Sequence, residues 1–182
     1  MAERYAREGF AVYALSRRAA PLAAGIARLR MRGVQVAAIE CEIGKPDDVD
    51  RELRVIAADR GTCDVLVYNA FVENGHSVDV ESASAAVSAV IKTMQVKGGG
   101  AVLFSTYECP EASVLREFAH DLAEEAEAFG MRVGILTIEG ALPASRTKLN
   151  AIADVYWELF FSADRLYEGE MRIRTHLLGE SE

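Results

Sequence analysis

Three hydroxyl-bearing residues stand together where an apolar segment of the sequence ends. Ser105, Thr106 and Tyr107 follow the run AVLF, and a short polar turn and an amphipathic pattern come after them. Catalytic and binding side chains of open α/β sheets lie beyond the carboxyl ends of the strands. A phenol in such a place can act as a general acid near neutral pH if its neighbours lower its pKa. Ser105 and Tyr107 are therefore the candidate catalytic residues.

Short apolar segments alternate with amphipathic helical patterns along the whole chain. The apolar segments are rich in β-branched residues, which is typical of strands that are covered on both faces. They lie at residues 10–16, 34–40, 63–69, 101–106 and 132–138, with a further candidate at 170–176. Helical patterns lie at 20–32, 46–60, 81–95 and 111–129. This alternation predicts one three-layer α/β domain over residues 1–182, with a mostly parallel, Rossmann-like sheet.

A parallel sheet brings the residues that follow its strands to one edge. Ligands of open α/β sheets bind at this edge, so a small-molecule site is expected there. The residues in question are Ser16, Arg17, Arg18, Glu42, Asn69, Ala70 and Gly140, besides those that follow AVLF. An arginine after a strand can pair with the 2′-phosphate of a nucleotide, and it can equally belong to a solvated turn.

Composition and charge exclude several classes of protein. The chain has 182 residues, of which 51% are hydrophobic, and this is enough for one compact domain with a real core. Its net charge of -8 disfavours a nucleic-acid-binding protein. No apolar run is long enough to span a bilayer, and the beginning, MAERYAREGF, lacks the features of a secretory signal. The cysteines and histidines show no metal-ligand spacing, so we expect a cytoplasmic protein with reduced thiols and no metal site.

Taken in order, the strand-end segments resemble those of the short-chain dehydrogenase/reductase family. The family's strand-end Asn-Asn-Ala-Gly motif is similar to CDVLVYNAF, and its adenine-contacting acidic-hydrophobic pair is similar to ECEIG. The second strand and the following helix of an NADP-preferring member of the family resemble ALSRRAAPLAAGIARLR. The long catalytic helix with the next strand and loop resembles LREFAHDLAEEAEAFGMRVGILTIEGALP. The resemblance implies NADP as the cofactor if one binds, and it gives cofactor-binding roles to Arg17, Arg18, Glu42, Asn69, Ala70 and Gly140.

The sequence departs from the family pattern where that pattern carries the chemistry. The family's first strand and glycine-rich turn would precede AERYAREGF, and the glycines at 98–100 come before a predicted strand instead of after one. None of the six tyrosines has a lysine four residues later, as the family's Tyr-x-x-x-Lys pair requires. That lysine lowers the pKa of the tyrosine, whereas Glu111 beside Tyr107 would raise it. The segments after Asn69 and Thr106 are also short for the family.

These losses predict a reduced and degenerate member of the family. We expect it to be catalytically inactive, to bind no cofactor and to act through binding or assembly. The alternative is an NADP-dependent oxidoreductase of small carbonyl or alcohol substrates, with an uncertain proton donor. A small hydrolase or transferase would have only Ser105 in its favour, and this serine stands outside a G-x-S-x-G turn.

The missing strand also bears on the sheet and on assembly. In the family order it would lie between the strands at 10–16 and 63–69, whose backbone groups would then be left unpaired. We expect these two strands to pair directly with each other. The resemblance implies a homodimer, because long helices on this sheet commonly pack across subunits in that family. The candidate contacts are the helix at 111–129 and the aromatic stripe of Trp157, Phe160 and Phe161, since aromatic side chains are typical of cores and interfaces.

Overall fold

The computed structural model describes residues 1–69, 80–109, 112–141, 145–161 and 170–178. The helices are α1 (Ala2–Arg7), α2 (Ala19–Arg30), α3 (Pro46–Arg60), α4 (Val80–Lys97), α5 (Ala112–Glu127) and α6 (Arg146–Phe161), with a 3-10 turn at Thr175–Leu177. The strands are β1 (Val12–Ser16), β2 (Val36–Glu40), β3 (Val65–Tyr68), β4 (Gly100–Tyr107), β5 (Met131–Glu139) and β6 (Glu170–Arg174). Each expected strand and helix is present within a few residues of its predicted bounds.

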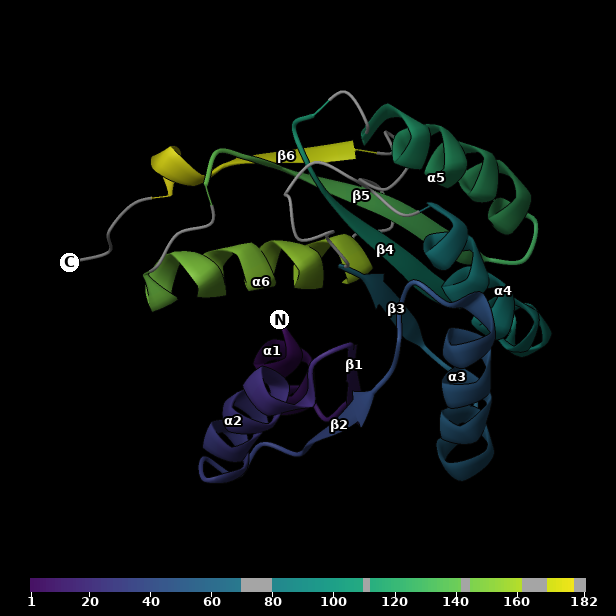
Figure 1. Cartoon of the computed structure of the whole chain (residues 1–182). Coiled ribbons are helices and arrows are strands. Elements are labelled where there is room, and N and C mark those ends of the chain that lie inside the picture. Colours follow the sequence, from purple (N-terminus) through teal and green to yellow (C-terminus); the bar gives the residue numbers. More distant parts are fainter. Residues whose placement is uncertain (70–79, 110–111, 142–144, 162–169, 179–182) are drawn as a thin grey trace.

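Every strand pairing in the described residues is parallel. β1 pairs with β2, from Val12 opposite Val36 to Ser16 opposite Glu40. A second sheet has the order β3-β4-β5-β6 (Figure 1). Each connection inside these sheets includes a helix, as right-handed crossovers between parallel strands require. The predicted Rossmann-like α/β architecture with a mostly parallel sheet is therefore confirmed.

Helices cover both faces of the four-stranded sheet. On one face, side chains of α4 and α5 pack on β4 and β5 and form a core around Phe104, Val90 and Leu115. On the other face, α6 lies against β4 and β5 through Ile152 and Tyr156, and α1 joins this second core. The interior strands β4 and β5 are accordingly buried along almost their whole length.

The aromatic stripe on α6 anchors the amino-terminal helix α1. Trp157 makes edge contacts with Tyr5 and Phe10, at centroid distances of 5.3 and 5.9 Å. Phe160 packs against the same two rings at 6.2 and 5.7 Å. Arg4 lies over the Trp157 ring and pairs with Asp154, so charge and stacking act together. These contacts fix the place of α1, and through it the place of β1.

The expected direct pairing of residues 10–16 with residues 63–69 is wrong. β1 pairs only with β2 among the described residues, and β3 pairs only with β4. The cause lies in the helices, because α1 is held on α6 while α3 packs on α4 on the opposite face. Moving β1 by one strand spacing, about 4.8 Å, would pull α1 away from its aromatic contacts. The two sheets therefore face each other across a gap.

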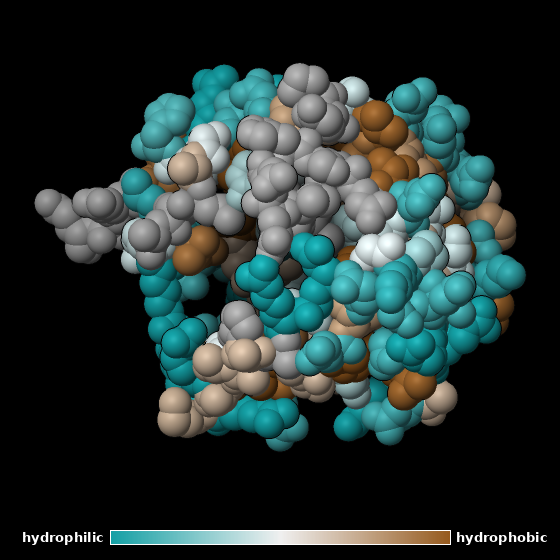
Figure 2. Space-filling view, in the orientation of Figure 1, coloured by the Kyte–Doolittle hydropathy of each residue, from teal (hydrophilic) through white to brown (hydrophobic). Residues whose placement is uncertain are grey.

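The surface is mainly polar on the side that Figure 2 shows, with hydrophobic side chains in small groups. The largest exposed apolar side chains include Phe161 on α6, which is 57% exposed, and Phe129 after α5, which is 45% exposed. Within the described residues, no helix combines the length and the apolar composition that a membrane crossing requires.

Candidate functional site

The residues after β1 form an exposed basic turn. Arg17 and Arg18 are both exposed, and the backbone N–H of Arg18 donates to the Ser16 hydroxyl at 3.3 Å. Arg18 occupies the position before α2 in extended conformation, and its side chain makes no capping hydrogen bond. The turn therefore leads from a strand into a helix, and it presents guanidinium groups where an anion could approach.

The ends of the next two strands carry further predicted residues. Glu42 and Asn69 are exposed, and Ala70 lies outside the described residues. Between β2 and Glu42, Cys41 is buried, and its N–H donates to the Ser16 carbonyl at 3.0 Å. Burial raises the pKa of the Cys41 thiol, so this cysteine remains protonated near neutral pH.

Ser105 lies inside β4 and is paired with a residue that sequence analysis did not single out. Its hydroxyl is buried and forms a hydrogen bond with the phenol of Tyr156 on α6. Tyr156 is itself almost fully buried, and the Tyr5 hydroxyl donates to its backbone carbonyl at 3.1 Å. Burial raises the pKa of Tyr156 far above its ordinary value. The Ser105–Tyr156 pair is thus a closed, satisfied contact between sheet and helix.

Tyr107 ends β4 and is half-buried beside the core that α6 covers. Burial raises the pKa of this phenol too. Its contribution to the electrostatic environment of Tyr156 shows that the two phenols lie near each other. Ser105, Tyr107 and Tyr156 therefore form one group where β4 meets α6.

Gly140, at the end of β5, has a structural reason to be glycine. Its φ is +94°, a conformation that residues with a Cβ rarely adopt. A Cβ at this position would also lie 2.8 Å from the Thr175 hydroxyl oxygen. That hydroxyl donates to the Glu139 carbonyl at 3.2 Å, which fixes the turn after β6 against β5. Close packing between neighbouring strand ends accounts for the glycine without a ligand.

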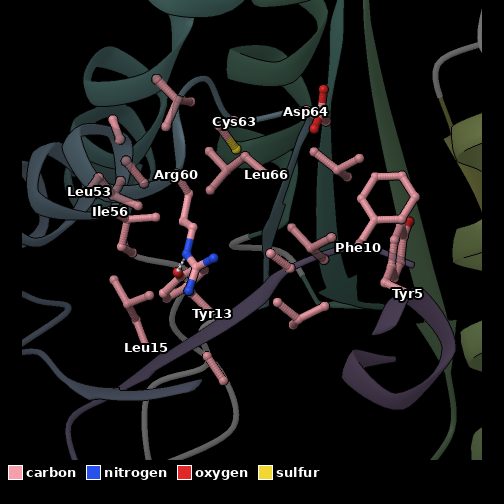
Figure 3. Close-up of a pocket in the computed structure, with 18 of the residues that line it drawn as sticks. Tyr5, Phe10, Tyr13, Leu15, Leu53, Ile56, Arg60, Cys63, Asp64 and Leu66 are labelled. Carbon is pink, nitrogen blue, oxygen red and sulfur yellow. Dashed lines mark hydrogen bonds between the residues drawn. The ribbon is translucent and has the colours of Figure 1, made fainter. Parts of the chain in front are cut away.

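The gap between the two sheets is a cavity of about 720 Å³ (Figure 3). The strand residues of its walls come from β1 and β3, with α3 and α4 over one face and α1 over the other. Most of the lining is apolar. The main polar feature is Arg60, whose guanidinium donates to the Tyr13 hydroxyl at 2.9 Å and links α3 to β1. Cys63 also lies here, and burial raises the pKa of its thiol to about 11.

The described residues do not fit a dinucleotide in the manner of Rossmann-like sheets. A pyrophosphate binds there on backbone N–H groups of a glycine-rich turn that follows a strand. Apart from Gly140, the described glycines with positive φ lie instead before strands or, for Gly100, at the first residue of a strand: Gly9, Gly33, Gly61, Gly98, Gly100 and Gly130. They shape the edge opposite to the basic turn. No cluster of metal-ligating side chains occurs within the described residues either.

Tyr156 is the residue that sequence reasoning missed. Its helix was noted only for the neighbouring aromatic stripe, which includes Trp157. The available signal was its place one turn after Ile152 and three residues before Leu159, on the apolar face of the helix. A tyrosine on a buried face needs a partner for its hydroxyl, and a serine in an apolar strand needs one as well.

Comparisons with known proteins agree on the fold. The family model described as short chain dehydrogenase matches residues 1–111. A metagenomic short-chain oxidoreductase in complex with NADP superimposes with a TM-score of 0.77 at 20% identity, over 95% of this chain and 89% of that one. L-sorbose reductase from Gluconobacter frateurii, complexed with NADPH and L-sorbose, gives 0.76 at 18% identity, over 96% and 89%. A betaketoacyl-[ACP] reductase from Bacteroides thetaiotaomicron gives 0.79 at 16% identity, over 95% and 89%. A search of curated proteins finds no match.

Proposed function

The chain belongs to the short chain dehydrogenase family, and from this premise we propose that it is a member without dehydrogenase activity that acts through binding or assembly. The observation that carries the proposal is the environment of the phenols at the end of β4. Burial raises the pKa values of Tyr107 and Tyr156 above the ordinary value of a tyrosine. A general acid that works near neutral pH needs the opposite shift.

The proposed role of these residues is structural. Ser105 and Tyr156 satisfy each other's hydrogen bonds between β4 and α6. Both phenols stay protonated and uncharged at neutral pH, so they can donate a hydrogen bond but cannot readily release a proton. The catalytic roles of Ser105 and Tyr107 stay a prediction, attached to the alternative function that follows.

The alternative is an NADP-dependent oxidoreductase of small carbonyl or alcohol substrates. It is supported by similar structures described as complexes with NADP and NADPH, and by the basic turn of Arg17 and Arg18. In this alternative Glu42, Asn69, Ala70 and Gly140 would line the nucleotide site with the arginines. Against it stands the poor fit of the described glycines to a pyrophosphate. We therefore expect NADP(H) to bind weakly or not at all.

A turnover assay tests the choice directly. We expect the purified chain to oxidise no NADPH above background with a panel of small ketones, aldehydes and quinones. Loss of a general acid alone removes a factor of about 10²–10⁴ in rate. Turnover that persists in Tyr156→Phe and disappears in Tyr107→Phe would overturn the proposal and identify Tyr107 as the acid.

A binding measurement separates the cofactor from the chemistry. Calorimetry with NADPH should give a dissociation constant weaker than the low micromolar range, which corresponds to about -8 kcal/mol. Tighter binding that falls in Arg17→Ala would show that the basic turn holds the 2′-phosphate and would favour the alternative function.

Assembly in the proposed function includes a homodimer. Exposed apolar side chains on α6 and around α5 support it, namely Leu149, Phe161, Val114 and Phe129. Side chains of this kind commonly lie at the centre of subunit contacts. We expect a dimeric mass by light scattering at tens of micromolar. A monomeric mass would reject the dimer. It would not bear on the proposed absence of catalysis, which the turnover assay tests separately.

A further inference from the structure

Two helices of this protein carry exposed charges of opposite sign. Residues 9–39, which include α2, carry five arginines and no carboxylate. Residues 117–131, which include most of α5, carry five carboxylates and neither lysine nor arginine. The chain as a whole has a net charge of -8, so α2 forms a cationic region on an anionic protein. One chain therefore offers two surfaces of complementary potential.

The arginines of α2 have no partner in the part of the chain that the structure describes. Arg17, Arg28 and Arg30 are exposed, and their side chains form no ion pair or hydrogen bond with any described residue. The arginines of α3 differ, since Arg54 pairs with Asp50 at 2.6 Å, one turn earlier on the same helix. No carboxylate of α2 can do the same. These cations are therefore free to pair with the carboxylates of another molecule.

The carboxylates of α5 are in the corresponding state. Four of them are exposed and have no cationic partner among the described residues: Glu117, Asp121, Glu125 and Glu127. The fifth, Glu124, lies 3.8 Å from His120, which is a cation only when it is protonated. Like charges three or four residues apart destabilise a helix, and a cationic partner relieves this repulsion. The surface of α5 is thus suited to a helix that carries arginines.

The two helices also match in length and in the order of their side chains. α2 has 12 residues and is about 18 Å long, and the acidic part of α5 from Glu117 to Glu127 extends about 15 Å. An apolar side chain follows each helix: Met31 after α2 is 80% exposed, and Phe129 after α5 is 45% exposed. In a parallel pairing Met31 would meet Phe129, because both stand beyond the carboxyl ends of their helices. A methionine sulfur makes favourable contacts with aromatic rings.

The two surfaces cannot meet within one chain. α2 packs on the two-stranded sheet through Ile26, and α5 packs on the four-stranded sheet through Leu115. Figure 1 shows the two helices at opposite ends of the molecule. Repulsion between two anionic copies is largely screened at about 0.1 M salt, where charges interact over about 10 Å, whereas ion pairs in direct contact persist. A second copy can therefore supply what each surface lacks.

We propose that α2 of one copy docks on α5 of a second copy, as a parallel pair of helices with their carboxyl ends together. The inference rests on the proposed assembly function, and it adds a charged contact to the apolar dimer contact. Because the two surfaces differ, the contact is heterologous and can repeat head to tail. Exposed ion pairs are weak, so we expect this association at protein concentrations on the order of hundreds of micromolar.

Reversal of charge on each helix tests the contact. The first variant carries Arg28→Glu and Arg30→Glu, and the second carries Glu124→Arg and Glu125→Arg. In sedimentation experiments at about 0.1 M salt, self-association beyond the dimer should weaken at least about tenfold in each variant. An equimolar mixture of the two variants should restore it, because the reversed α2 of the first then meets the reversed α5 of the second. A mixture that stays dissociated would overturn the proposal.

A matched control separates the contact from net charge. Arg51→Glu with Arg54→Glu makes the same change of charge on α3, and it should alter self-association less than about twofold. An equal loss in this control would overturn the assignment to α2. Thermal melting of every variant controls for folding. If Glu117→Arg with Asp121→Arg restored association with the first variant better than the second variant does, the parallel arrangement would be wrong.

The outcomes are separate from those of the proposed function. No association of the unmodified chain beyond the dimer at these concentrations would overturn the contact and leave the arginines of α2 to an acidic partner of another kind. A dimeric mass at tens of micromolar that persists in both variants would leave the apolar dimer standing. The NADPH assay is independent of both, so observed turnover would leave the charged contact standing.

Discussion

The two sheets of this protein contain similar sequences in different surroundings. In β4 the side chains from Ala101 to Thr106 are all buried, whereas every side chain of β1 is only half-buried. Both segments have the sequence of interior strands. Among the described residues, however, β4 has a strand on each side, whereas β1 has a strand on one side only. The comparison shows that helices on both faces do not suffice to bury a strand, because its open edge still admits solvent.

The two sheets also differ in how they are held. The four-stranded sheet lies between two helical layers that contribute side chains to continuous cores. The two-stranded sheet has a small core of its own around Ile26, Val34 and Val36, and it joins the rest largely through α1. Its attachment is therefore the weaker link, and the following predictions test that difference.

The largest expected effect is a loss of core packing in the four-stranded sheet. Phe104 is fully buried and stacks near Tyr68 and Phe118, so Phe104→Ala should lower the free energy of unfolding by about 3–5 kcal/mol. Leu15→Ala in half-buried β1 should lower it by about 1 kcal/mol. Urea unfolding measures both. Equal losses would mean that β1 is as well packed as β4 and would break the comparison.

The attachment of α1 should fail next. Trp157 packs on Tyr5 and Phe10, so Trp157→Ala should lower the free energy of unfolding by about 3 kcal/mol. Hydrogen exchange should accelerate across residues 2–40 and stay slow in β4 and β5. Val96→Ala, at a side chain that is 90% exposed, is the control and should change neither region. Uniform acceleration in all strands would show that the two sheets unfold as one unit.

Local patterns predicted the helices and strands because apolar runs and helical periodicity depend only on residues that are close together in the sequence. They could not predict that β1 and β3 lie apart instead of pairing with each other. The position of β1 depends on where α1 docks on α6, and this contact joins residues far apart in the sequence. The strand-end rule selected Ser105 and Tyr107 as candidates, and their catalytic roles stay a prediction. It did not find Tyr156, whose hydroxyl meets Ser105 across 51 residues of chain. Gly140 was interpreted as a ligand residue, and its contact with Thr175 is visible only in three dimensions.

Alkaline pH should weaken the α1 attachment selectively. Burial raises the pKa of Tyr5 from 10 to about 12, so the folded state favours the neutral phenol. This contribution is fully present below about pH 10 and is lost as the pH rises through about 12, and it amounts to roughly 2–3 kcal/mol. Unfolding free energies measured across this window should fall less steeply in Tyr5→Phe. The same slope in both proteins would contradict the assigned burial, and Tyr13→Phe, with an exposed hydroxyl contact, serves as the control.

The smallest effect concerns the charges that hold α1. The Glu3 carboxylate is 19% exposed and pairs with Arg7, Arg32 and Arg146 at 2.5, 2.9 and 2.9 Å. Two of these arginines lie outside α1, so the pairs fix the helix to α6 and to the turn after α2. A partly buried carboxylate with several cationic partners contributes more to stability than an isolated surface pair does. Glu3→Gln should therefore lower the free energy of unfolding by about 1 kcal/mol.

The matched substitution is Asp50→Asn on α3, whose carboxylate pairs with Arg54 four residues later on an exposed helix surface. An exposed pair of this spacing contributes only about 0.3–0.5 kcal/mol. High salt should shrink the Asp50→Asn effect more than the Glu3→Gln effect, because screening acts mainly on exposed charges. Hydrogen exchange should speed up in β1 and β2 for Glu3→Gln alone. If Asp50→Asn had the same effect there, the attachment would be spread over the helices, because α3 would then hold β1 as firmly as α1 does.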